Sequence, residues 1–191
     1  MTSAGIDLAP CVVSVVVSGS SDTFVKRNPQ AHPDFYAAEA TGLRWLGEAA
    51  APVVGVRGHG RTYIELDRLV AARPTPGAAE RFGRTLAAMH SAGADGFGAP
   101  PVDADGVVFS GRLFIGARPM SSTVHRSWGA FYAAERVLPF LRSAVDAGTV
   151  MQGEAEIVES ACGRIADGDF DDAEPPSRIH GDLWNGNVFW T

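Results

Sequence analysis

The residues best placed to do chemistry lie near the end of the chain, where His180, Gly181 and Asp182 are followed by Asn187. An aspartate can orient an acceptor hydroxyl and take its proton, and an asparagine five residues later can hold a metal ion on nucleotide phosphates. The spacing predicts phosphoryl transfer, with Asp182 as the catalytic base and Asn187 as a metal ligand. The alternative is a structural loop in which both side chains bond their own backbone.

Two other residues of this loop have different expected roles. His180 is expected to be structural, packing inward and bonding the backbone. Trp184 is an aromatic side chain within a polar loop. It either stacks on a sugar or aliphatic part of the substrate or fills space below the loop, and the sequence favours neither role.

A second candidate constellation consists of Lys26 and Glu39. Residues 23–26 predict a strand, and residues 34–50 predict a helix on which Phe35, Glu39 and Leu46 share one face. A carboxylate on a buried face needs a cation or hydrogen bonds, and Lys26 is a suitable partner. A strand lysine held by a helix glutamate contacts the ATP phosphates in kinases. The alternative is two solvated side chains.

Other elements surround these residues. We expect strands over residues 11–17, 53–56, 62–66 and 188–190, and helices over residues 76–91, 128–147 and 154–166. Residues 18–22 form a turn that pairs the first strand with 23–26, and its serine-rich part (18–21) is a candidate anion nest. Gly58 and Gly60 bracket another turn. Thr75 should cap a helix that Pro76 begins, and Pro139 should kink the long one.

The order of elements predicts an α+β fold of the protein-kinase-like, two-lobed kind. Residues 1–69 would form a small β-rich N-lobe with the ATP-side strands and one helix. Residues 70–76 would be the hinge or linker. Residues 77–191 would form a mainly helical, partial C-lobe that ends at the catalytic loop.

Composition excludes some partners. The 191 residues carry a net charge of −6, which argues against nucleic acid because binding its backbone needs clustered cations. No segment approaches the ~18 consecutive apolar residues typical of a membrane span. Cys11 and Cys162 are far apart, and we interpret them as free thiols in a reducing compartment. We therefore expect a cytoplasmic protein; the sequence does not specify its oligomeric state.

The chain resembles the fructosamine kinase (ketosamine 3-kinase) family, within the aminoglycoside phosphotransferase and protein-kinase-like superfamily. The specific part is HGDLWNGN at residues 180–187, which looks like the HGDLWxGN motif of that family. Five further stretches agree and extend the resemblance over roughly residues 23–191: FVK at 24–26, FYAAEATGLRWL at 35–46, FGRTLAAMH at 82–90, and the FIG and WxxFYxxxRL segments that begin at 114 and 128.

The resemblance implies that ATP and Mg²⁺ are used to phosphorylate the 3-hydroxyl of a ketosamine, such as a free or protein-bound fructosyl- or ribulosyl-amine. Because the 3-phosphate product is unstable, the reaction would serve deglycation. Asp182 would be the base and Asn187 a metal ligand, and Lys26 and Glu39 would be the ATP pair. The stretch from Asp67 to Leu69 would meet adenine through backbone groups.

The same resemblance indicates a C-terminally truncated chain. The family continues past this loop into an Ile-Asp-Pro segment whose aspartate binds magnesium, and the sequence stops at Thr191 before it. We therefore expect a fragment or a decayed copy of a kinase. Two alternatives stay open: a kinase of another small hydroxylated amine, such as an aminoglycoside or choline, and an inactive pseudokinase or binding fragment.

Overall fold

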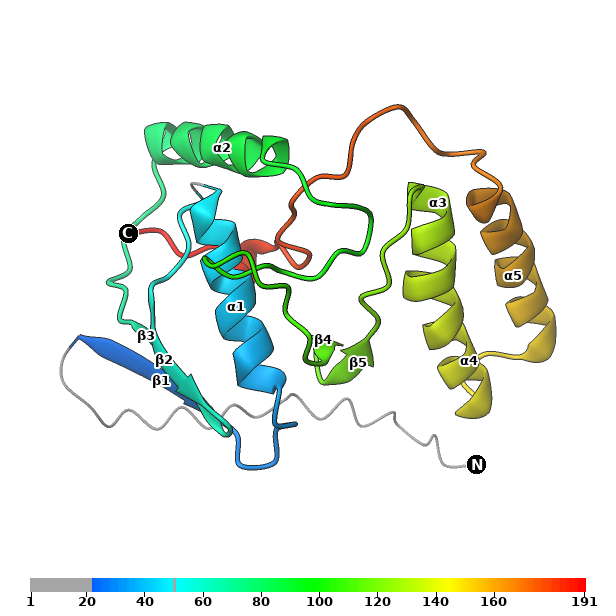
Figure 1. The fold of residues 1–191 in the computed structure, drawn as a ribbon, viewed down its shortest axis with the longest axis horizontal. Coiled ribbons are helices and arrows are strands. Elements are labelled where there is room, and N and C mark those ends of the chain that lie inside the picture. The colour runs from blue at the N-terminus through cyan, green and yellow to red at the C-terminus, as the bar shows by residue number, and fades with distance from the viewer. Residues whose placement is uncertain (1–21, 50) are drawn as a thin grey trace.

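The computed structural model describes residues 22–49 and 51–191. The predicted strand at 11–17, the serine-rich nest at 18–21 and Cys11 lie outside the described residues. Within the described part, the chain forms two antiparallel sheets and a set of helices in an α+β arrangement (Figure 1).

The larger sheet has three strands in the order β1-β3-β2, namely β1 (Thr23–Arg27), β3 (Tyr63–Asp67) and β2 (Val56–Gly60). The predicted strand at 53–56 was wrong, because the strand begins where that prediction ended. Gly58 and Gly60 therefore lie inside β2 and not in the turn, which falls at residues 61–62. A side chain at Gly60 would come within 2.5 Å of the Tyr63 ring, so this close pairing requires glycine.

Helix α1 (Phe35–Glu48) connects the sheet to the rest of the molecule. Its first half packs on the sheet through Tyr36 and Ala40, which meet Ile64 and Leu66 of β3. The buried line is thus displaced by one residue from the predicted Phe35–Glu39 face. Glu39 lies at the edge of this contact with 26% of its side chain exposed, where it can reach polar partners.

The second half of α1 packs on α2 (Pro76–Ser91), which crosses one end of it in Figure 1. Leu46, Ala49 and Met89 form this second apolar cluster. The predicted start of α2 is confirmed, because the Thr75 hydroxyl accepts a hydrogen bond from the Ala78 amide at 3.2 Å and Pro76 is the first helical residue. An irregular stretch, residues 68–75, links β3 to this helix.

The remaining helices form a separate layer on the far side of α1 (Figure 1). A hairpin of β4 (Leu113–Ile115) and β5 (Arg118–Met120) leads into α3 (Trp128–Phe131), the π-helical η1 (Tyr132–Val137), α4 (Leu138–Asp146) and α5 (Gln152–Ala166). The kink expected at Pro139 appears as the π turn just before it, where the Leu138 amide bonds the Ala133 carbonyl five residues back.

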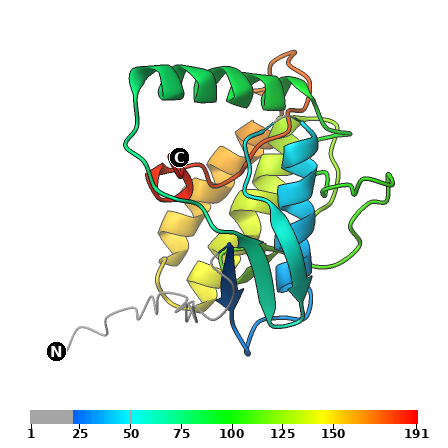
Figure 2. The same cartoon turned by 90° about the vertical axis from the view of Figure 1, so that its left-hand side faces the viewer.

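The last segment runs back from the helical layer toward the linker between β3 and α2 (Figure 2). It contains a single 3₁₀ turn, η2 (Asn185–Asn187). The predicted strand at 188–190 was wrong: these residues have no assigned strand, and the Trp190 carbonyl accepts a hydrogen bond from the Ala72 amide at 2.8 Å. The Trp190 ring also meets Phe82 of α2 edge-on.

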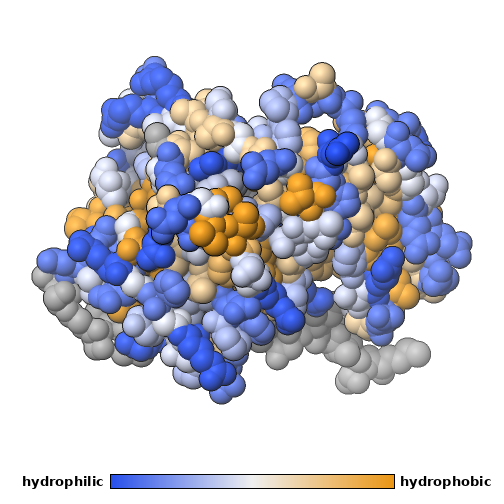
Figure 3. All heavy atoms as spheres, viewed as in Figure 1, coloured by the Kyte–Doolittle hydropathy of each residue, from blue (hydrophilic) through white to orange (hydrophobic). Residues whose placement is uncertain are grey.

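Hydrophilic residues cover much of the face drawn in Figure 3, and apolar residues lie between them in scattered groups. The last segment contributes exposed apolar side chains to the surface: Ile179, Leu183, Trp184 and Phe189. No helix in the described part of the chain combines the length and the apolar character that crossing a bilayer would require.

Candidate functional site

Lys26 lies on the face of the sheet that α1 covers. It is directly opposite Ile64 in the antiparallel register of β1 and β3, and opposed residues share a face. Ile64 is fully buried in the core between sheet and helix. The lysine stem therefore leaves the strand beside the core and reaches along α1, while Val25 points to the opposite face.

The predicted contact between Lys26 and Glu39 is present. Lys26 Nζ donates to Glu39 Oε1 at 2.5 Å, and the two side chains are 27% and 26% exposed. Partial burial makes the pair stronger than an exposed one and leaves the ammonium accessible to a ligand.

One signal for Lys26 is compositional. It is the single lysine of the 191 residues, and arginine supplies the other 15 of the 16 basic side chains. Lysine offers a compact ammonium where arginine offers a planar fork, so the two do not substitute for each other at a tight site. A lysine in a chain that otherwise uses arginine indicates a position where the ammonium itself is needed.

Asp182 and Asn187 also meet as their spacing predicts. The Asn187 amide nitrogen donates to the Asp182 carbonyl oxygen at 2.8 Å and to Asp182 Oδ2 at 2.9 Å. Both partners are acceptors, so the nitrogen must face Asp182 and the amide oxygen of Asn187 faces away from it. The contact leaves Oδ1 of Asp182 and Oδ1 of Asn187 as the atoms able to serve a hydroxyl proton and a cation.

Residues 180–187, which we call the HGD loop, owe their shape to local contacts. Gly181 has a φ of +82°, a conformation that favours glycine. The Asp182 amide then donates to His180 Nδ1 at 3.2 Å, so His180 bonds the backbone as expected. Trp184 is 62% exposed, and its indole lies so close to Gly186 that a Cβ there would overlap the ring. The ring is available at the surface for contact with a ligand.

The predicted adenine-contacting stretch becomes narrower in the structure. The Asp67 amide donates to the Gly55 carbonyl at 2.8 Å, and its carboxylate accepts a hydrogen bond from Arg57. The Arg68 amide donates to the Asp22 carbonyl at 3.0 Å. Among Asp67, Arg68 and Leu69, the amide donor free of these contacts belongs to Leu69, so the adenine prediction now rests mainly on that residue.

A magnesium ion would find a partial set of ligands in this arrangement. Mg²⁺ prefers one or two protein oxygens together with phosphates and waters, and the free amide oxygen of Asn187 is of this type. Within the described residues, no three or more His, Cys, Asp or Glu side chains gather as they would around a metal ion. The amide oxygen of Asn187 fits a magnesium ion that nucleotide phosphates and waters also hold.

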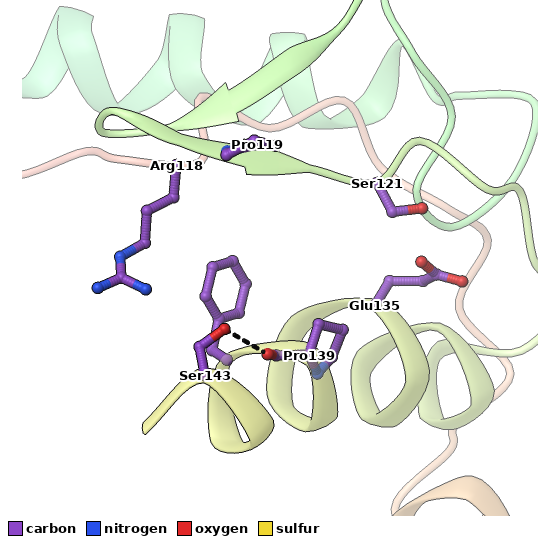
Figure 4. A pocket seen from close by; sticks show the side chains of 7 residues that line it. Arg118, Pro119, Ser121, Glu135, Pro139 and Ser143 are labelled. Carbon is purple, nitrogen blue, oxygen red and sulfur yellow. Dashed lines mark hydrogen bonds between the residues drawn. The ribbon is translucent and has the colours of Figure 1, made fainter. Parts of the chain in front are cut away.

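Sequence reasoning missed a polar cluster beside a small cavity under the β4–β5 hairpin. The cavity, of about 170 Å³, is bounded by Arg118 and Ser121 on the hairpin and by Glu135 and Ser143 on the helices (Figure 4). Glu135 Oε1 bonds His125 Nε2 at 2.9 Å. No predicted site residue lines this cavity, so we assign it no part in phosphoryl transfer.

This cluster predicts an acid dependence of stability. Hydrogen bonding from the Ser121 hydroxyl lowers the pKa of Glu135 below its usual 4.5, with a smaller effect of the same sign from His125 and an opposing one from burial. A lowered pKa in the folded state gives stability that is present above about pH 4.5 and is lost as the pH falls through the folded-state pKa. Urea unfolding of Glu135→Gln between pH 6 and pH 3 should therefore show a flatter pH dependence than wild type. An identical slope would contradict this assignment.

Sequence reasoning also missed Arg178, which lies two residues before His180. Its partners are the ring and the backbone carbonyl of Trp45, on α1. Neither contact could be foreseen, because 133 residues separate Arg178 from Trp45. A backbone carbonyl also gives no signal in the sequence, since every residue has one.

Comparison with known proteins adds to this geometry. A family model described as fructosamine kinase matches residues 5–191. A probable ketoamine kinase of Thermus thermophilus is 32% identical over 166 residues, covering 87% of this chain and 55% of the relative. The protein-ribulosamine 3-kinase of Arabidopsis thaliana, a chloroplast protein, is 28% identical over 183 residues, covering 86% of this chain and 49% of the relative.

Solved structures agree in fold. A Thermobifida fusca protein assigned as a fructosamine-3-kinase is 42% identical and superimposes with a TM-score of 0.76, covering 88% of this chain and 56% of that one. A Haemophilus somnus protein with the same assignment is 20% identical, with a TM-score of 0.67. The match covers 92% of this chain and 60% of that protein, and it shows likeness of fold alone. The chain thus spans roughly half to three-fifths of the length of these relatives.

Proposed function

Because the chain belongs to the fructosamine kinase family, we propose that its protein transfers the γ-phosphoryl group of ATP to the 3-hydroxyl of a ketosamine. The observation that carries the proposal is the contact of Asn187 with Asp182 inside the HGDLWNGN motif. That contact orients a carboxylate and an amide oxygen as the chemistry needs them. We retain the two-lobed division at residues 70–76 as part of the same proposal.

Asp182 would accept the proton of the substrate hydroxyl. The hydroxyl oxygen forms a bond to the γ-phosphorus, the bond from that phosphorus to the bridging oxygen of ADP breaks, and the proton passes to the free Oδ1 of the carboxylate. The hydrogen bond from Asn187 to Oδ2 keeps the carboxylate from rotating away. Positioning of this kind supplies most of the catalysis in phosphoryl transfer.

Lys26 would bind the phosphates of ATP, and Glu39 would hold its ammonium in place. Leu69 would meet adenine through its backbone. Asn187 would hold magnesium through its amide oxygen, and the ion neutralises charge on the phosphates when bound. The side chain of Trp184 is proposed to stack on the sugar or amine portion of the substrate, because most of its ring is exposed beside the loop.

The substrate class is part of the proposal. A ketosamine carries a sugar-derived chain on an amine, and removal of its phosphorylated form would serve deglycation of small amines or proteins. We place the reaction in the cytoplasm, where ATP is available. The test is Mg²⁺-dependent release of ADP in the presence of a ribulosyl- or fructosyl-amine. Turnover only with an aminoglycoside or choline would indicate a different kinase, and ATP binding without any turnover would indicate a binding protein.

Removal of the Lys26 ammonium should weaken phosphate binding. We expect Lys26→Met to lower kcat/KM for ATP by about 10²-fold, the usual effect of removing one charged donor from a transferring phosphate. Lys26→Arg is the matched control for charge, and it should also lose most activity because the guanidinium cannot reproduce a compact ammonium beside Glu39. Steady-state kinetics with varied ATP measure both.

The single lysine gives an independent readout of the same site. Within this sequence an amine-reactive reagent has one lysine to modify, Lys26. Mass spectrometry should show that Mg²⁺ and ATP slow this modification. Labelling at an unchanged rate in saturating ATP would remove Lys26 from the nucleotide site.

A further inference from the structure

Arg178 joins the segment that leads into the HGD loop to helix α1. Its Nη1 donates to the Trp45 carbonyl oxygen at 2.6 Å, and its guanidinium carbon lies 4.1 Å from the centre of the Trp45 ring. The guanidinium is thus fixed by a directional hydrogen bond and by stacking on the same residue. Trp45 lies on the helix that also carries Glu39.

The carbonyl that Arg178 binds belongs to the last turn of α1. The final carbonyls of a helix lack partners within the helix, and a cation there also interacts favourably with the helix dipole. The Ala49 amide, which would normally bond Trp45, bonds the Leu46 carbonyl at 3.1 Å instead. Arg178 therefore donates to a carbonyl that the Ala49 amide does not bond, and it fixes one end of α1.

Backbone contacts secure the chain on both sides of this point. The Pro176 carbonyl accepts a hydrogen bond from the Ala94 amide at 3.1 Å, just past the end of α2. The Trp190 carbonyl accepts one from the Ala72 amide in the linker. Between these anchors, Arg178 provides a side-chain contact from the segment to α1, the helix of the Lys26–Glu39 pair.

A purely structural role would favour a different residue here. The Nε atom of Arg178 is buried and has no hydrogen-bond partner among the described residues, which is unfavourable for a charged group. A methionine of similar length would pack on Trp45 and leave no unpaired donor. The arginine offers what an apolar side chain lacks, namely a fixed direction and distance between the loop and the helix.

We propose that Arg178 is a positioning residue that holds the HGD loop, with Asp182 and Asn187, in register with α1 and its Lys26–Glu39 pair. The proposal rests on the proposed function for its kinetic consequence, because the two pairs must act on the same nucleotide. The structural consequence is that α1 restrains the HGD loop, and this consequence does not depend on the proposed function. Small displacements of reacting groups lower turnover strongly, so the kinetic effect should exceed the effect on stability.

The main test compares Arg178→Met with wild type in the same protein. We expect kcat to fall by about 10- to 100-fold with little change in the KM for ATP, since the ATP pair itself is intact. The melting temperature should change little, because the unpaired Nε is removed together with the hydrogen bond. Arg178→Lys, which can still reach the Trp45 carbonyl, should recover part of the rate. Arg142→Met, at an exposed arginine of α4, is the matched control and should behave as wild type.

Hydrogen exchange gives a readout that does not depend on activity. Backbone amides of residues 180–188 should exchange faster in Arg178→Met, and faster also in Trp45→Leu, which removes the ring and keeps the carbonyl. Faster exchange with lowered kcat at an unchanged melting temperature supports the proposal. Wild-type kcat and exchange in Arg178→Met, or a rate that falls only with the folded fraction, overturn it.

These readouts separate the two proposals. If wild type phosphorylates no amine, the proposed function fails, and exchange at residues 180–188 decides the role of Arg178 alone. If Arg178→Met does not fold, Arg178→Lys and Trp45→Leu are compared with wild type instead. The measurements are again kcat and hydrogen exchange at residues 180–188.

Discussion

Replacing Asp182 with asparagine is expected to lower kcat by about 10³-fold, within the range by which positioned acid–base groups accelerate reactions. The amide cannot take the hydroxyl proton. It can still accept the hydrogen bond that Asn187 donates to the side chain at 2.9 Å, so the loop should keep its shape. ATP affinity and melting temperature should therefore stay close to wild type, and steady-state kinetics with calorimetric ATP titration measure the difference.

Asp105→Asn is the matched control for this substitution, because Asp105 is exposed in a turn far along the chain from the HGD loop. It removes the same charge and should leave kcat unchanged. Full activity in Asp182→Asn would exclude Asp182 as the base. Loss of ATP binding together with activity would instead indicate that Asp182 acts mainly by holding the metal ion.

The second large effect is on stability and concerns Gly129, where α3 meets α5. A Cβ at this position would overlap the Ile165 carbonyl oxygen and lie 2.9 Å from its carbon. The Gly129 amide also donates to Asp171 Oδ1 at 2.7 Å, so its backbone is tied to the segment that follows α5 and cannot easily move away. We expect Gly129→Ala to lower the free energy of unfolding by about 3 kcal/mol, as severe overpacking does. Thermal unfolding should show a melting temperature lower by roughly 10 °C.

The substitution Gly83→Ala should change the free energy of unfolding in the opposite direction. Gly83 lies inside α2, and a Cβ there meets nothing within 4 Å. Alanine should stabilise the helix by about 0.5–1 kcal/mol because glycine loses more backbone freedom on folding. Equal effects of the two substitutions would show that the contact with Ile165 does not limit the packing of α3 on α5.

The pairing of Lys26 with Glu39 illustrates how sequence reasoning succeeded despite an imperfect helix face. The predicted stripe was displaced by one residue, because Tyr36 and Ala40 fill the space against Ile64. A side chain at the edge of a buried stripe still reaches the neighbouring strand, so the displacement did not break the contact. The π turn before Pro139 was also predicted in part. An irregularity was expected there because proline lacks an amide hydrogen, but the form of the irregularity depended on packing.

Two of the predicted strands were wrong, one in its position and one in its existence. The stretch at 53–56 is apolar and looks like a strand, yet pairing with β3 selected Val56–Gly60, which includes two glycines and a histidine. Within residues 22–49 and 51–191 no strand lies beside the apolar run at 188–190, and the Trp190 carbonyl bonds the linker instead. Strand formation depends on an available partner, and that information is not local.

The sequence alone was enough to identify the two residue pairs that we propose for phosphoryl transfer. Asp182 and Asn187 are five residues apart, and Lys26 and Glu39 are thirteen apart on adjacent elements, so local spacing was enough to bring each pair together. Only the tertiary structure decided how the pairs are joined. Arg178 bonds the Trp45 carbonyl, which lies 133 residues away in the sequence. Because every residue has a backbone carbonyl, the residue type at position 45 gives no sign of this contact. The partner of Arg178 becomes visible only when the fold brings the end of α1 beside the loop.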